Sequence, residues 1–137
     1  MPVWRSELSV ALPQRHRLKG QRIFDRLYQK ARKHHGPAMV LRCLDAVPAL
    51  LPPEQATRAP SPWRCGVVVS SKVHKRAVQR NRLRRLVHRH LMSVMDHGVA
   101  SPSRWLLISL KPGSAERSPE ALLGECSQLL KQAGLTP

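Results

Sequence analysis

Acidic side chains are scarce in this chain, whose 137 residues include 8 Asp and Glu against 24 Lys and Arg, for a net charge of +16. The carboxylates are scattered singly, and none occurs from Gln55 to Met95. Nucleases that act alone need clustered carboxylates to hold metal ions or a general base constellation. The sequence therefore argues against a nuclease in its own right.

Cysteine is also scarce, with only Cys43, Cys65 and Cys126. The odd number, the wide spacing and the absence of a Cys-x-x-Cys pair argue against a disulfide framework and a zinc ribbon. We expect buried free thiols instead. The seven histidines show no metal-ligand spacing, so no metal site is expected on the protein itself.

Long apolar runs are missing, since the longest, from Trp105 to Leu110, is far too short to span a bilayer. Residues 1–13 include Arg5 and Glu7 and do not resemble a secretory signal. We expect a cytoplasmic protein with a flexible leader over residues 1–13 and one folded domain over residues 14–134. The hydrophobic content of 42% is sufficient for a modest core.

Aromatic residues are few, and Phe24 and Tyr28 are the only Phe and Tyr. They lie one helical turn apart beside Ile23 and Leu27, where a core role and a binding role are equally plausible. The chain has no aromatic run of the kind that RRM domains use to stack bases. A DNA-binding helix-turn-helix is disfavoured too, because no short helix precedes the basic segment by a tight turn.

Hydrophobic periodicity predicts an α+β domain with the order α-β-β-α-β-α and one small sheet covered by helices. An amphipathic helix around residues 23–31 should stop at Gly36-Pro37, and a last helix should begin at the N-cap Ser118 and stop at Gly134. The predicted strands are 38–44, 65–70 and 105–110. A long basic helix, about 75–97, should connect the last two, and a Pro-rich loop covers residues 47–62.

The basic segment is the most informative feature of the chain. Its eight cations have no acidic neighbour in the sequence: Lys72, Lys75, Arg76, Arg80, Arg82, Arg84, Arg85 and Arg89. A compact domain keeps such a repulsive cluster when an anionic partner meets it. Arginine predominates, and its planar fork binds phosphate oxygens in pairs and stacks on bases. We therefore expect a nucleic-acid partner.

Helical geometry divides this segment into two faces. Leucine, valine and methionine side chains from Leu83 to Met95 form an apolar stripe, and Arg82, Arg85 and Arg89 fall on the opposite side. Arg80 and Arg84 come nearer the apolar edge, from which they can reach a neighbouring surface while their stems cover the core.

The motif Arg-Ala-x-x-Arg-Asn-Arg-Leu-Arg-Arg at 76–85 resembles the signature of the protein subunit of bacterial ribonuclease P. That ribonucleoprotein removes the 5′ leader of precursor tRNA. Residues 15–18 with Phe24 and Tyr28, residues 66–70 and residues 106–112 are similar to further segments of the family in the same order. The resemblance covers about residues 15–130.

The resemblance implies a two-layer α/β sandwich with a left-handed crossover around the long helix, against the usual right-handed preference. It implies binding of the catalytic RNA by Lys72, Lys75, Arg76, Arg80, Asn81, Arg82, Arg84, Arg85 and Arg89. It places the leader of precursor tRNA in a cleft formed by Phe24, Tyr28, Val40 and Arg42. Further RNA contacts would come from Arg15, Arg17 and Lys19.

The implied activity is endonucleolytic, with the chemistry carried by the RNA subunit and its Mg²⁺, no cofactor on the protein and one protein per RNA. This chain departs from the family at Arg42, where relatives often have an aromatic residue, and at His88, where Arg or Lys is usual. The loop between the first two predicted strands is also longer than in many relatives. A ribosomal or general RNA-binding protein fits the charge equally well, and only the order of the motifs separates the two.

Overall fold

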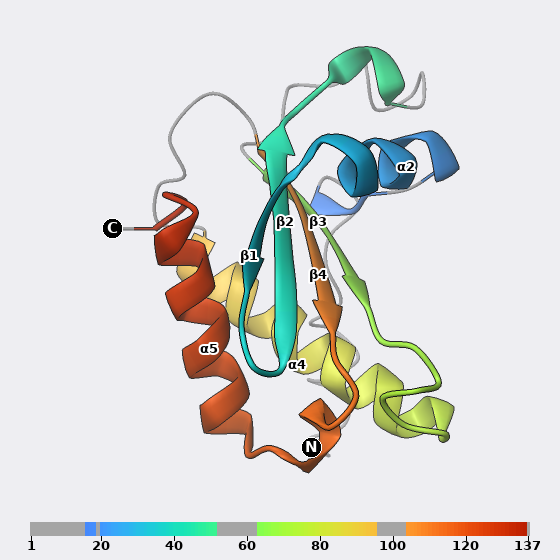
Figure 1. The fold of residues 1–137 in the computed structure, drawn as a ribbon, viewed down its shortest axis with the longest axis vertical. Helices are drawn as coiled ribbons and strands as arrows, with labels where there is room; N and C mark the ends of the chain where they lie inside the picture. Colours follow the sequence, from blue (N-terminus) through green and yellow to red (C-terminus); the bar gives the residue numbers. More distant parts are fainter. Residues whose placement is uncertain (1–15, 19, 52–62, 96–103, 137) are drawn as a thin grey trace, which may run out of the picture.

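The computed structural model describes residues 16–18, 20–51, 63–95 and 104–136 (Figure 1). The predicted leader, Arg15, Lys19, His97 and residues 52–62 of the Pro-rich loop lie outside this part. The described helices and strands are α2 (Gln21–Lys30), β1 (Arg32–His35), β2 (Met39–Asp45), β3 (Trp63–Val68), α4 (Ala77–Met95), β4 (Arg104–Leu110) and α5 (Pro119–Gln132). All six predicted elements are confirmed, with small shifts at their ends, and β1 is additional.

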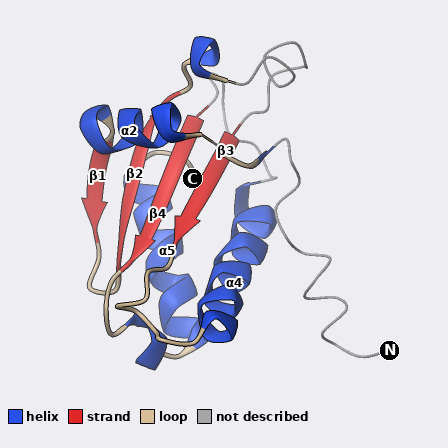
Figure 2. Ribbon diagram, turned by 90° about the vertical axis from the view of Figure 1, so that its right-hand side faces the viewer, coloured by secondary structure: helices blue, strands red, loops and turns tan. Residues whose placement is uncertain are grey.

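The four strands form one sheet in the order β1-β2-β4-β3, in which β1, β2 and β4 pair antiparallel and β3 pairs parallel with β4. The connection between the parallel strands runs through α4. In Figure 1, β3 and β4 point downward, and β4 lies to the left of β3. Helix α4 passes behind the sheet in this view, and Figure 2 also shows it on the side of the sheet opposite α2. This is the left-handed crossover that the family resemblance implied.

The strand that the sequence did not predict, β1, has the sequence Arg-Lys-His-His. It has no apolar alternation because it is an edge strand, with charged side chains of the kind that discourage further pairing. The first helix ends at Lys30, so the predicted stop at Gly36-Pro37 is wrong. Those two residues instead lie in the turn that joins β1 to β2, where the Glu125 carboxylate accepts a hydrogen bond from the Ala38 amide at 2.9 Å.

The two faces of the sheet carry separate apolar clusters. Met39, Leu41 and Cys43 of β2 point to the face covered by α4 and α5, together with alternate residues of β3 and β4. The opposite face packs Trp105 and Leu107 against Ile23 and Leu27 of α2. Figure 2 shows α2 on one side of the sheet and α4 on the other. The α+β class is thus confirmed, with helices on both faces.

The three cysteines are free and buried, as the sequence predicts. Burial raises the pKa of the Cys65 thiol well above its usual range and that of Cys126 to about 12. The predicted N-cap is also confirmed, because the Ser118 hydroxyl accepts a hydrogen bond from the Ala121 amide at 3.1 Å. Across the described ranges, no helix combines the length and the apolarity that crossing a bilayer requires.

Candidate nucleic-acid interface

Helix α4 separates an apolar side from a basic side, as predicted. Val87, Leu91 and Met95 are buried against the sheet. Arg82 and Arg89 are exposed on the outer side, and Arg85 beside them is half-buried. The helix can therefore bind an anion through one side without losing the packing of the other.

Arg80 and Arg84 reach neighbouring backbone, as their place near the apolar edge suggested. The Arg80 guanidinium donates to the carbonyl oxygens of His74 at 2.9 Å and Lys75 at 2.8 Å. Arg84 donates to the Val67 carbonyl of β3 at 3.4 Å and to the Asn81 side chain at 2.6 Å. Each guanidinium has five donors, so both retain capacity for phosphate while they hold α4 against the preceding loop and the sheet edge.

The loop before α4 extends the basic surface. Lys72, Lys75 and Arg76 are all exposed there, and the His74 imidazole accepts a hydrogen bond from the Arg76 amide at 3.0 Å. In the part of the chain that the structure describes, the only ion pair joins Arg104 to Asp45 at 3.1 Å, at another place in the fold. None of the eight cations of the basic segment is therefore neutralised by a described carboxylate.

Arg17 joins this surface from the N-terminal side. Residues 16–18 run along the outer edge of β3, where the Leu18 amide donates to the Cys65 carbonyl at 3.2 Å. Arg17 is exposed and lies close enough to His88 to act on its charge. Burial, and then the charges of Arg84 and Arg17, lower the pKa of His88 to about 4. His88 is therefore neutral at pH 7, and the charge of this helical turn comes from its arginine neighbours.

A second candidate surface lies on the other face of the sheet, beside α2. The Arg42 guanidinium lies 4.7 Å from the centre of the Tyr28 ring and donates to the Ser109 hydroxyl at 3.4 Å. Tyr28 is 46% exposed. Val40 pairs with Ser109 in the adjacent row of the sheet and points to the same face. The four residues assigned to the cleft thus come from one helix and one strand that face each other.

Phe24 and Tyr28 differ in their surroundings. Phe24 is half-buried and packs against the cluster of Ile23 and Leu27. A Cβ atom at Gly66 of β3 would lie 2.9 Å from the Phe24 ring, which is closer than such atoms normally approach. The ring can therefore pack here only because position 66 is a glycine. Phe24 therefore contributes to the core, whereas the side chain of Tyr28 is exposed enough to meet a ligand.

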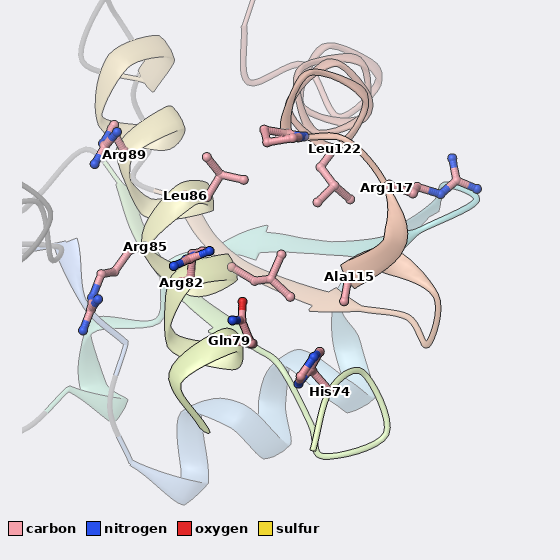
Figure 3. A pocket seen from close by; sticks show the side chains of 11 residues that line it. His74, Gln79, Arg82, Arg85, Leu86, Arg89, Ala115, Arg117 and Leu122 are labelled. Carbon is pink, nitrogen blue, oxygen red and sulfur yellow. The ribbon is translucent and has the colours of Figure 1, made fainter. Parts of the chain in front are cut away.

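A hollow of about 360 Å³ separates the basic side of α4 from the beginning of α5 (Figure 3). Its lining comprises His74, Gln79, Arg82, Leu83, Arg85, Leu86, Arg89, Ala115, Arg117, Pro119 and Leu122. The sequence did not predict it, and Arg117 in particular was missed. Arg117 gives no periodic signal, and only the tertiary fold brings it opposite α4.

Metal ligands do not cluster in the described ranges, where no three His, Cys, Asp or Glu side chains come together in a way that could hold an ion. The donor set of these residues therefore does not fit a Mg²⁺ site. Guanidinium and ammonium groups dominate the basic side of α4 and the loop before it, and the second surface adds the single guanidinium of Arg42, so both suit anionic ligands.

This small α/β domain has an arginine-rich helix that forms no ion pair with a described carboxylate, and on the other face of its sheet an exposed tyrosine ring lies against an arginine. Both are features of RNA-binding proteins. The ribonuclease P family model matches residues 12–134, so the chain belongs to the ribonuclease P protein family. A ribonuclease P protein component from Parasynechococcus marenigrum (strain WH8102) is 50% identical over 92% of this chain and 98% of its own length. One from Prochlorococcus marinus (strain MIT 9303) is 45% identical with the same coverage.

Solved structures show the same fold at low sequence identity. The ribonuclease P protein of Staphylococcus aureus superposes with a TM-score of 0.68 at 17% identity, covering 89% of this chain and 98% of that one. The protein of Thermotoga maritima superposes with a TM-score of 0.64 at 19% identity, covering 85% and 96%.

Proposed function

We propose that this chain is the protein component of a ribonuclease P ribonucleoprotein. It binds the catalytic RNA and the 5′ leader of precursor tRNA, and assists the endonucleolytic cut that gives the mature 5′ end. One protein binds one RNA subunit in the cytoplasm. The observation that carries the proposal is the basic surface of α4, which pairs with no carboxylate of the described residues, in a chain of this family.

The basic surface is the site for the RNA subunit. Its exposed members are Lys72, Lys75, Arg76, Asn81, Arg82 and Arg89, with Arg80, Arg84 and Arg85 half-buried between them. Because Arg80 and Arg84 are already tied to backbone carbonyls, they present their remaining donors from fixed positions. Fixed forks lose less conformational entropy when they bind phosphate than free side chains do. Arg17 extends this surface along the edge of β3, and Arg15 and Lys19, which precede and follow it, are assigned the same role.

The cleft beside α2 is the site for the leader. Tyr28 offers a ring on which a base can stack, and stacking tolerates any base sequence. Arg42 covers that ring at 4.7 Å, so an incoming base would replace or join the guanidinium on the ring while the cation turns to a phosphate. Val40 and Phe24 supply the apolar border. The aromatic residue that the family often has at position 42 is thus exchanged here for a cation.

Catalysis is assigned to the RNA subunit, which would hold the Mg²⁺ ions that the reaction needs. The protein contributes positioning and charge. Its cations reduce the repulsion between two polyanions, RNA subunit and precursor tRNA, so less Mg²⁺ is needed to bring them together.

Reconstitution tests the proposal. Purified protein, the ribonuclease P RNA of the same host, and both together are assayed on precursor tRNA over a range of Mg²⁺ concentrations. We expect no cleavage by the protein alone and cleavage at lower Mg²⁺ by the mixture than by the RNA alone. Cleavage by RNA-free protein would contradict the assignment. Equal binding of ribonuclease P RNA and unrelated structured RNA, without any effect on cleavage, would favour a general RNA-binding protein.

A further inference from the structure

The hollow between α4 and α5 combines an apolar floor with a basic rim. Leu83 and Leu86 of α4 and Leu122 of α5 form the floor with Ala115 and Pro119. Leu86 and Leu122 point into the space between the two helices in Figure 3. A purely electrostatic phosphate contact needs no apolar floor, so the hollow has a property that the basic surface alone does not explain.

The rim supplies cations from both sides. Arg82, Arg85 and Arg89 come from α4, and Arg117 comes from the turn before α5. Among the described residues that line the hollow none is acidic, and the nearest carboxylates in the sequence, Glu116 and Glu120, are exposed outside the lining. The occupant must therefore carry negative charge at the rim and present an apolar, flat or compact group to the floor.

We propose that this hollow receives one unstacked nucleotide of the RNA subunit, with its base on the leucine floor and its flanking phosphates on the arginine rim. This inference rests on the proposed function. Single-stranded loops and bulges of RNA are recognised by bases that leave the stack and lie against apolar side chains or guanidinium planes. The volume of about 360 Å³ lies at the lower end of the range for small-ligand pockets and suits one nucleobase.

Charge complementarity decides between this occupant and an apolar segment of another protein. An apolar helix or peptide would offer no acceptor to the four rim arginines, three of which are exposed, and would gain nothing from their charge. A nucleotide satisfies floor and rim together, because its phosphates accept from arginine forks while its base covers the leucines.

Filling the hollow tests the proposal without removing charge. Ala115 lines the hollow and is half-buried. Ala115→Leu should therefore fill the hollow in part, and Ala115→Phe should fill more of it. Ala121→Phe adds the same ring at an exposed position outside the lining and is the matched control. Affinity for the host ribonuclease P RNA is measured over a salt series, with thermal melting to verify the fold.

We expect Ala115→Phe to weaken binding of the RNA subunit by about tenfold, within the range for loss of one base contact, and Ala115→Leu to weaken it less. The slope of log affinity against log salt should stay unchanged, because every phosphate contact remains. Binding by Ala115→Phe as tight as by Ala121→Phe would overturn the proposal, as would a shallower slope. If Ala115→Phe fails to fold, the affinity of Ala115→Leu for the RNA subunit is compared with that of Ala121→Phe, and equally tight binding would again overturn the proposal.

A second measurement needs no variant. Methyl NMR of Leu83, Leu86 and Leu122 in the complex with the RNA subunit should show ring-current shifts from the base, absent in the free protein. Unshifted methyl resonances in a complex that forms and cleaves would refute the pocket while leaving the proposed function intact. Failure of the RNA to bind wild-type protein at all would instead contradict the proposed function.

Discussion

The two candidate RNA surfaces, the basic side of α4 and the cleft beside α2, are built in opposite ways. The first comes from one continuous stretch of sequence, in which helical geometry alone sorts cations from leucines. The second needs α2, β2 and β4 together, since Tyr28, Arg42 and Ser109 meet only in the folded sheet. We expect the first surface to bind mainly through charge, which salt screens, and the second mainly through contact with rings, which salt affects little.

The largest effect should come from removing charge on α4. Replacing Arg82 and Arg85 by Ala deletes two phosphate contacts, each worth about 1.5–3 kcal/mol when charge-assisted. The slope of log affinity for the RNA subunit against log salt should become shallower by roughly one unit per contact. A double Lys replacement should recover part of the slope but less of the affinity, because the bidentate fork is lost. Salt titrations of RNA binding give both quantities.

A matched control removes the same charge elsewhere. Lys30 and Lys131 are exposed at the ends of α2 and α5, away from the described basic surface. The double Ala variant at these positions should bind the RNA subunit nearly as well as wild type. An unchanged slope in the Arg82 and Arg85 variant would mean that this side of α4 does not touch RNA.

The cleft should respond to the loss of rings with an intermediate effect. Tyr28→Ala should weaken binding of precursor tRNA by about 1–3 kcal/mol and leave mature tRNA almost unaffected, because only the precursor has a leader to stack. Phe24→Ala should weaken the same binding and also lower the melting temperature, since Phe24 packs against the core and over Gly66. Tyr28→Phe keeps the ring and is the control. Equal losses for precursor and mature tRNA would assign both aromatics to structure alone.

The contrast between the two surfaces also explains what the sequence could predict. Apolar periodicity located three helices and three strands, and charge density located the basic surface, because both signals are local. Strand β1 was missed because Arg-Lys-His-His has no apolar side to bury and is held by backbone pairing with β2. The contact of Arg42 with Ser109 depends on strand register, and the position of Arg117 opposite α4 depends on how α5 packs. Neither leaves a pattern in the sequence.

The last prediction concerns folding stability and not RNA binding, at His88 on α4, where burial and two arginines lower its pKa to about 4 from the ordinary 6.5. Between these two values the unfolded chain binds a proton that the folded chain does not, so acid favours unfolding there. The contribution of neutral His88 to stability is complete above pH 6.5 and is lost as the pH falls toward 4. Denaturant unfolding of wild type and His88→Gln across this interval should show that the free energy of unfolding declines more steeply with falling pH in wild type.

NMR titration of the His88 imidazole measures its pKa directly. Arg17→Ala should raise this pKa, although burial, the larger cause, keeps it below the ordinary value. A His88 that titrates near 6.5 in the folded protein would mean that it is solvated and carries charge into the basic surface at mildly acidic pH.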